Sequence, residues 1–121
     1  ESIKTGKIEK VNIIRESLMG GMSCGEPSLV PWEILKNSVD NCISLPDDNI
    51  GRAMKLFANA SFSNDKIVAG ENSAPGAISL ITCCNDEIIK KKINLNEISN
   101  VLLIGCEGDT DQDIYQKLIK D

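Results

Sequence analysis

Helical spacing of apolar side chains covers much of this sequence, and short apolar runs lie between the helical stretches. After Ser28, the side chains of Trp32, Leu35 and Val39 fall on one helical face, which predicts a helix from a serine N-cap to about Asp40. Similar spacing and capping signals predict further helices over residues 47–57, from about Ser73, over residues 86–92, and from a capping box at Thr110 and Asp113.

Short runs of apolar or β-branched residues predict strands between these helices, at residues 7–14, 42–45, 66–70 and 101–104. Residues 101–104 are continuously apolar, as a strand buried in a parallel sheet usually is. Strands that alternate with helices predict a three-layer αβα fold of the α/β class, whose middle layer is a short, mostly parallel sheet of about three to four strands. The turns at residues 19–28, 69–77 and 101–111 are then predicted to converge on the edge of the sheet where ligands bind.

Two glycines in the first of these turns are candidate ligand-binding residues. Gly20 and Gly21 have no β-carbon, so their backbone can adopt positive φ and approach a flat ligand closely. A glycine-rich connector explains them equally well. Their spacing matches neither a dinucleotide fingerprint nor a P-loop, so the residues alone do not indicate a ligand.

Glu71 and Cys106 follow predicted strands and are the candidate side chains of the other two turns. The carboxylate of Glu71 precedes a helix start, where it could meet a cation or an amine, or could simply complement the helix dipole. Cys106 can form one weak hydrogen bond, and the carboxylates of Glu107 and Asp109 disfavour its thiolate. A nucleophilic cysteine is therefore not expected, which leaves an inert buried thiol or a hydrogen-bond partner for a heteroaromatic ring.

Composition excludes several other classes of function. The chain has 121 residues and a net charge of −5, its basic residues are dispersed, and no apolar run is long enough for a membrane span, so neither nucleic acid nor a membrane is an expected partner. Five cysteines without histidine predict reduced thiols in the cytoplasm and no metal site. The first residues lack both a methionine and a signal sequence, so the chain is expected to be an interior piece of a longer protein.

These motifs, in this order, resemble the C-terminal part of diaminopropionate ammonia-lyase, a pyridoxal-phosphate enzyme of the tryptophan-synthase-β structural type, fold type II. Residues 23–28 (SCGEPS) resemble the family's glycine-loop signature, Gly70-Glu71 with Ala74 and Gly76 its next motif, and residues 101–105 with 107–111 its last. The sequence departs from the family at Asn72-Ser73, where Ser-Gly is usual, and at Cys106, where Ser or Thr is usual.

The resemblance implies that residues 1–121 are the C-terminal part of the enzyme's larger, catalytic domain. It implies pyridoxal 5'-phosphate as cofactor, held partly by Cys106, Gly20, Gly21 and Glu71, with Cys106 beside the pyridine nitrogen. The implied reaction is elimination from an amino acid, 2,3-diaminopropionate, to give pyruvate and ammonia, in a homodimer when the enzyme is complete.

No residue of this chain matches the family's cofactor-binding lysine motif, its phosphate-binding loop or its general-base aspartates, so no catalytic residue is expected here and the chain alone is predicted to be inactive. Two alternatives stay open. One is a threonine or serine dehydratase of the same structural type, and the other is a non-catalytic α/β domain that binds a small ligand.

Overall fold

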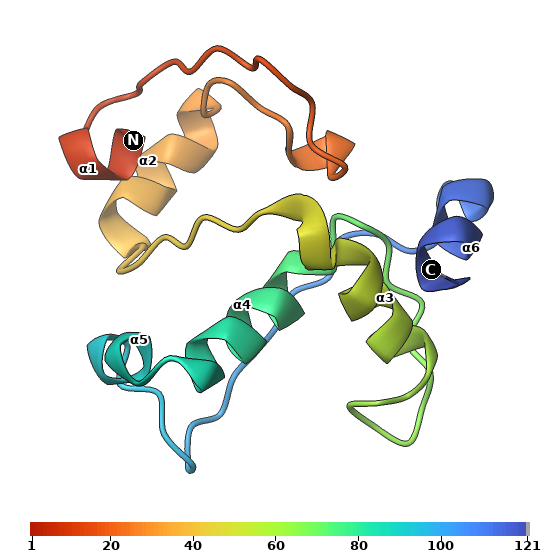
Figure 1. Ribbon diagram of the computed structural model, residues 1–121. Helices are drawn as coiled ribbons and strands as arrows, with labels where there is room; N and C mark the ends of the chain where they lie inside the picture. The colour runs from red at the N-terminus through yellow and green to blue at the C-terminus, as the bar shows by residue number, and fades with distance from the viewer. Residues whose placement is uncertain (121) are drawn as a thin grey trace. The chain divides into compact units, whose positions relative to one another are not determined.

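The computed structural model describes residues 1–120, which fall into two compact units, one from Glu1 to Ile43 and one from Ser44 onward. The first unit contains helix α1 (Ser2–Thr5), the 3₁₀ helix η1 (Gly20–Met22) and helix α2 (Leu29–Ser38) (Figure 1). The second contains η2 (Asp47–Asn49), α3 (Ile50–Ala58), α4 (Pro75–Asn85), α5 (Glu87–Lys92) and α6 (Gln112–Lys120).

In the first unit, a long irregular segment between α1 and α2 is fixed at two points. The Val11 N–H donates to the Gly25 carbonyl oxygen (2.8 Å), and the Lys10 ammonium lies 2.9 Å from the Glu26 carboxylate. Gly25 suits this contact because a β-carbon there would lie 2.5 Å from the Val11 carbonyl oxygen. The chain therefore needs glycine at position 25, where the two extended segments of this loop meet.

Helix α2 confirms the prediction made from its apolar face. Its N-cap is Ser28, in an extended conformation, and its last residue is Ser38, close to the predicted end at Asp40. Trp32 is its buried residue, with 6% of its surface exposed. One large aromatic side chain thus contributes most of the apolar area that this short helix can bury.

The second unit has a core formed by three helices. Helix α3 packs against α4 and α6, and close approach to α6 is possible because Gly51 faces the Leu118 backbone. The buried side chains of this core are Ile50, Ala53, Met54, Ala77, Ile78, Cys83 and Tyr115. The helices predicted over residues 47–57, from about Ser73 and over 86–92 are confirmed as η2 with α3, α4 and α5.

The predicted αβα sheet is wrong. No residue from 1 to 120 forms a strand, and the segments 7–14, 42–45, 66–70 and 101–104 are extended or irregular. A ladder requires repeated backbone bonds between neighbouring strands. One such bond is present near the last two of these segments, from the Gly70 N–H to the carbonyl oxygen of Glu107, three residues after the end of 101–104 (3.0 Å).

The apolar run at residues 101–104 is also exposed, although it was predicted to be buried. Leu102 is 84% exposed and Ile104 is 80% exposed. Its continuous apolar sequence predicted cover on both faces, but helix α4 lies along one side only, where Gly76 faces Leu103 (Figure 1). The side chains that point away from α4 find no cover among the described residues of this unit.

Helix α6 begins slightly later than predicted. The capping box was expected at Thr110 and Asp113, but the Asp111 carboxylate accepts the Ile114 N–H (3.0 Å) and the helix starts at Gln112. The cap is therefore one residue further along the chain. Three apolar side chains of α6 are covered at least in part, with Tyr115 buried and Leu118 and Ile119 half-buried.

Candidate functional site

Two of the three predicted turns meet in the second unit. The turn at residues 70–73, closed by a bond from the Ser73 N–H to the Gly70 carbonyl oxygen (3.0 Å), lies against residues 105–108. Gly70 permits this approach, because a β-carbon at that position would overlap the Gly108 carbonyl oxygen. The convergence predicted for these two turns is therefore found without the sheet that was expected to produce it.

Glu107 is the centre of the contact between the two turns. Its carboxylate oxygen Oε2 accepts the Asn72 backbone N–H (3.1 Å) and the Asn72 side-chain Nδ2–H (2.7 Å). The Ser73 hydroxyl donates to the Glu107 carbonyl oxygen (2.7 Å) and accepts the Glu107 N–H (2.8 Å). Both the backbone and the side chain of Glu107 are thus held by the residues that follow Gly70.

On one side of this contact, Asn72 and Ser73 are buried, with 8% and 7% of their surfaces exposed. The bond from Nδ2 to Glu107 fixes which end of the Asn72 amide is nitrogen. The amide oxygen Oδ1 is buried and has no hydrogen-bond partner in the described part of the chain. A buried acceptor without a hydrogen-bond donor lowers the stability of the folded protein, because it has lost its bonds to water.

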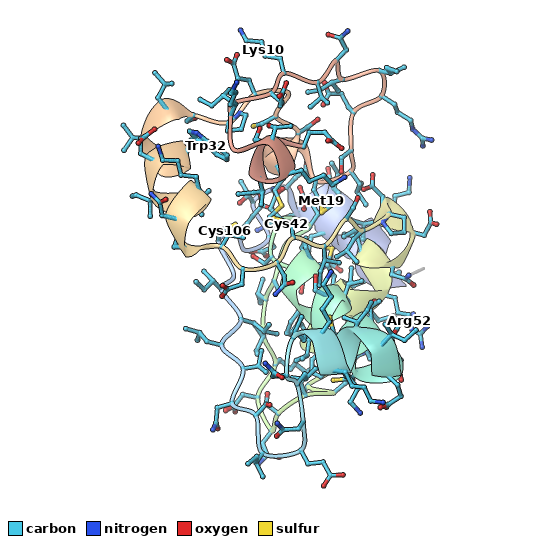
Figure 2. The ribbon with its side chains drawn as sticks, turned by 90° about the vertical axis from the view of Figure 1, so that its left-hand side faces the viewer. Lys10, Met19, Trp32, Cys42, Arg52 and Cys106 are labelled. Carbon is cyan, nitrogen blue, oxygen red and sulfur yellow. The ribbon has the colours of Figure 1, made fainter. Side chains whose placement is uncertain are left out.

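Cys106 lies at the end of the extended segment that leads toward α6 (Figure 2). Its residue surface is exposed, so the first of the two alternatives left open by the sequence, an inert buried thiol, does not hold. The Sγ atom lies 3.7 Å from the Asn72 carbonyl oxygen, at hydrogen-bond distance for sulfur. The thiol is therefore accessible on one side and contacts the opposite turn on the other.

The other predicted site residues, Glu71, Gly20 and Gly21, form no hydrogen bond with Glu107. Glu71 is half-buried, and its carboxylate forms no hydrogen bond or ion pair with any residue from 1 to 120. Gly20 and Gly21 lie in η1 of the first unit and are exposed. Neither of these glycines has the positive φ that the sequence analysis expected them to permit; among the described residues, Gly6 is the glycine with a positive φ.

Three residues that make the site were not predicted as site residues: Asn72, Ser73 and Glu107. Two of them are the positions where the sequence departs from the family pattern. That departure was the available signal, because Asn and Ser side chains can each bond to backbone groups at a turn. Their partner Glu107 lies 34 to 35 residues away in the sequence, so spacing alone could not pair them.

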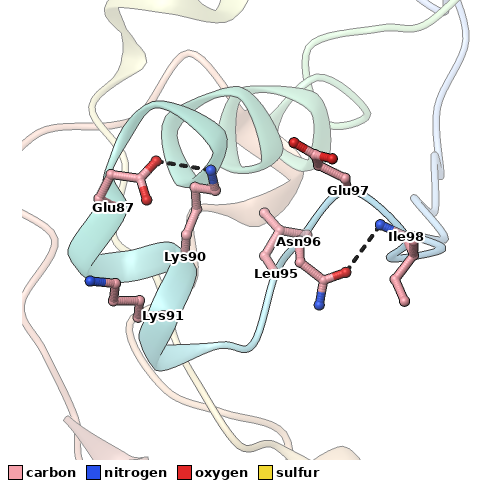
Figure 3. Close-up of a pocket in the computed structure, with 7 residues that line it drawn as sticks. All are labelled: Glu87, Lys90, Lys91, Leu95, Asn96, Glu97 and Ile98. Carbon is pink, nitrogen blue, oxygen red and sulfur yellow. Dashed lines mark hydrogen bonds and ion pairs between the residues drawn. The ribbon is translucent and has the colours of Figure 1, made fainter.

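One hollow of the second unit gathers no comparable chemistry. Figure 3 shows it over α5 and the turn after it, where Lys90 pairs with Glu87 (2.9 Å) and the Asn96 oxygen accepts the Ile98 N–H (3.0 Å). The charged side chains there are mostly exposed, and two of them, Lys90 and Glu87, are paired with each other. This hollow is accounted for by the local capping and ion-pair contacts of α5.

Two properties of the described residues concern other kinds of site. Within residues 1–120, every helix is too short or too polar to cross a bilayer. The same residues contain no group of three or more His, Cys, Asp or Glu side chains arranged to hold a metal ion.

Comparison with known proteins shows which class of protein this chain is similar to. No family model matches the chain. The solved structure and curated sequences that do match it are ammonia-lyases, and they match along nearly its whole length.

The matched proteins are diaminopropionate ammonia-lyases, so the resemblance predicted from the motifs is confirmed. The chain is 30% identical over 118 residues to the enzyme of Escherichia coli strain K12, with 94% of this chain and 29% of the relative covered. The Salmonella typhimurium LT2 enzyme is 30% identical over 107 residues, with 85% and 26% covered.

A solved structure gives the same result. The E. coli diaminopropionate ammonia-lyase in complex with an aminoacrylate-PLP azomethine reaction intermediate superposes with a TM-score of 0.81 and 31% identity, over 98% of this chain and 30% of that one. The chain therefore spans less than a third of the length of the enzymes that it matches.

Proposed function

We propose that this chain is part of a pyridoxal-phosphate-dependent lyase that converts 2,3-diaminopropionate to pyruvate and ammonia. The observation that most supports this is the superposition over 98% of the chain, with a TM-score of 0.81, on the E. coli enzyme that holds a reaction intermediate. The proposal includes three finer points: the chain is the C-terminal part of the catalytic domain, the complete enzyme is a homodimer, and it acts in the cytoplasm.

We propose Cys106, Glu71, Gly20 and Gly21 as this chain's contribution to the cofactor pocket. The state of the first two side chains fits that role, since the Cys106 thiol is exposed and the half-buried Glu71 carboxylate has no partner in the described part of the chain. When bound, pyridoxal phosphate supplies the electron sink that stabilises negative charge at the substrate α-carbon.

The role proposed for Cys106 is a hydrogen bond to the pyridine nitrogen. A thiol is a weak hydrogen-bonding group, and unlike a carboxylate it does not strongly favour a charged pyridinium. A moderated electron sink suits elimination, because the α-carbanion should expel its β-amino group instead of persisting. Cys106 would thus orient the ring without taking a proton from the substrate.

The proposed test uses the protein encoded by the complete reading frame around this segment. We expect it to release pyruvate and ammonia from 2,3-diaminopropionate, while residues 1–121 alone with pyridoxal phosphate release no pyruvate above a boiled control. Faster turnover of serine or threonine would favour a dehydratase. Binding of a small ligand without any turnover would favour the non-catalytic domain, and either outcome would overturn the proposal.

Replacement of Cys106 in the complete enzyme tests the site. Cys106→Ala should retain bound pyridoxal phosphate, measured by its absorbance, because the phosphate and the covalent attachment would lie elsewhere. It should lower kcat by roughly ten-fold, the effect of losing about one hydrogen bond of 1 to 1.5 kcal/mol. Unchanged kcat and KM would make Cys106 merely structural.

A further inference from the structure

A groove between α3 and α4 combines an apolar floor with polar side chains at its rim. It has a volume of about 240 Å³ and lies within the second unit, where these two helices pack against each other. Its lining residues come from the two helices and from Asn49, the last residue of η2. None of them belongs to the two turns that meet at Glu107, so the chemistry of the α3–α4 groove is separate from that contact.

The floor of the groove consists of apolar side chains from both helices. Ala53 and Ile78 are buried, with 2% and 6% of their surfaces exposed, and Leu56 is half-buried. Ile81 keeps 38% of its surface exposed beside them. Covering an apolar surface stabilises a complex by about 25 cal/mol for each Å² removed from water. The floor therefore favours a ligand with an apolar body.

One of the residues that line the groove is charged, Arg52, which is exposed on α3 (Figure 2). Asp48 lies four residues earlier, a spacing at which helical ion pairs form. However, no ion pair joins Arg52 to Asp48 or to any other residue from 1 to 120. A guanidinium presents its N–H donors in a planar fork that matches a carboxylate, and the first turn of a helix also attracts an anion. The rim therefore favours a ligand with a carboxylate.

Three neutral polar side chains complete the rim: Asn49, Thr82 and Asn85. Those of Asn49 and Thr82 form no hydrogen bond with any residue from 1 to 120, and the Asn85 amide donates to the Ile81 carbonyl oxygen (2.9 Å). Amide and hydroxyl groups can donate to a carboxylate, and they carry no charge that would repel it. The rim as a whole is thus complementary to a single negative charge.

We propose that the α3–α4 groove binds a small aliphatic carboxylate, with the carboxylate on Arg52 and the aliphatic body on the apolar floor. An inorganic phosphate would pair with the guanidinium equally well, but it has no apolar part to cover the floor. A neutral hydrocarbon would cover the floor and leave the guanidinium without an anion. The inference goes beyond the proposed lyase function and does not depend on it, because no residue of the groove is assigned to the cofactor pocket.

The test titrates 4-methylpentanoate into the complete protein and follows binding by saturation-transfer NMR of the ligand. The expected dissociation constant is on the order of 1 mM, in keeping with a ligand of about eight non-hydrogen atoms. The neutral analogue 4-methylpentanamide should bind about ten-fold more weakly, because it has no charge to pair with Arg52. Equal binding of the acid and the amide, or no saturable binding of the acid, would overturn the proposal.

Replacement of the guanidinium shows where the acid binds. Arg52→Gln should weaken binding of 4-methylpentanoate about ten-fold and make the acid and the amide bind alike. Lys66→Gln is the matched control, since it makes the same change of charge on an exposed side chain of the same unit that does not line the groove. It should leave binding unchanged. If the two variants weaken binding equally, only the net charge matters and the proposal fails.

A series of acids tests the contribution of the apolar floor. The affinity should rise by about two- to four-fold for each CH₂ group from acetate through butanoate to 4-methylpentanoate. Equal affinities along the series, or displacement of 4-methylpentanoate by an equal concentration of inorganic phosphate, would mean that Arg52 binds anions without the floor, and would overturn the proposal. Binding to residues 1–121 but not to the complete protein would mean that the rest of the protein covers the groove, and would overturn it as well.

Discussion

The substitution Gly70→Ala tests whether the close approach of the two turns stabilises the second unit. The added β-carbon would overlap the Gly108 carbonyl oxygen and would lie 3.0 Å from both Cγ and Oε2 of Glu107. The glutamate side chain can rotate away, but the carbonyl oxygen belongs to the backbone. The turns must therefore separate, and the bond from the Gly70 N–H to the Glu107 carbonyl oxygen (3.0 Å) is lost or lengthened.

The expected cost combines three effects. Forcing an extra carbon into a packed contact costs about 1–3 kcal/mol. Losing the Gly70 hydrogen bond costs about 1 kcal/mol more. Alanine lowers the conformational entropy of the unfolded chain relative to glycine, and this stabilises the folded protein by about 0.4–1 kcal/mol. The free energy of unfolding should therefore fall by about 1–3 kcal/mol.

Urea unfolding followed by far-ultraviolet circular dichroism measures this change. With a slope of about 1–3 kcal/mol per molar urea, the midpoint should fall by about 1 M. Gly108→Ala is the matched control, because a β-carbon there has no atom within 4 Å, and it should leave the midpoint unchanged or slightly raised. A Gly70→Ala midpoint equal to that of Gly108→Ala would refute the argument that the turns depend on this contact.

Three further substitutions test the core, a cap and a buried hydroxyl. Met54→Ala removes a side chain with no exposed surface from α3 and should cost about 2–5 kcal/mol in the same urea assay, whereas a loss below 1 kcal/mol would mean that the site collapses around the cavity. Asp86→Ala removes an oxygen that accepts the Ile88 and Ile89 N–H groups (2.9 and 3.0 Å), and should cost about 0.5–2 kcal/mol, with Asp86→Asn closer to the parent. Burial, and secondarily the Asp109 carboxylate, raises the pKa of Tyr115. The stability that this shift contributes should be complete below about pH 10 and lost as the pH rises through the folded-state pKa. Tyr115→Phe should abolish this loss of stability at high pH, and a variant with the same pH profile as the parent would contradict the argument.

The helices were predictable because their signals are local. A serine stands at the N-cap of α2, a proline in the first turn of α4 lacks an N–H that would need a partner, and the Asp86 side chain accepts two free N–H groups at the start of α5. The apolar faces behind them repeat every three to four residues, so both the caps and the periodicity can be read from one short window of sequence. The predicted starts of α4 and α6 are each within about two residues of the observed ones, at Pro75 and Gln112.

The sheet could not be predicted reliably because a strand depends on partners that are distant in sequence. Residues 101–104 have the composition of a buried parallel strand, and composition is all that a local pattern contains. Whether neighbouring strands are present is a property of the fold, and the described residues supply one backbone bond where a ladder needs several. An apolar run therefore predicted extended backbone, which is present, and burial, which is not.

In the candidate site too, the residues found from local motifs were predictable, and the contacts between residues distant in sequence were not. The motifs led to Cys106 and Glu71, and the structure brings the turns that carry them together. The residues that join the turns were recognised only as departures from a family pattern, at Asn72 and Ser73. Their function at this contact depends on Glu107, and no local rule relates residues 34 to 35 positions apart.

The departures at Asn72, Ser73 and Cys106 lie in one contact around Glu107. A glycine at position 73 would have no hydroxyl to hold the Glu107 backbone, and a serine at position 72 would be too short to reach the carboxylate as the asparagine amide does at 2.7 Å. Cys106 directly precedes Glu107, and its Sγ lies 3.7 Å from the Asn72 carbonyl oxygen. The three departures are therefore best understood as one change in a single contact.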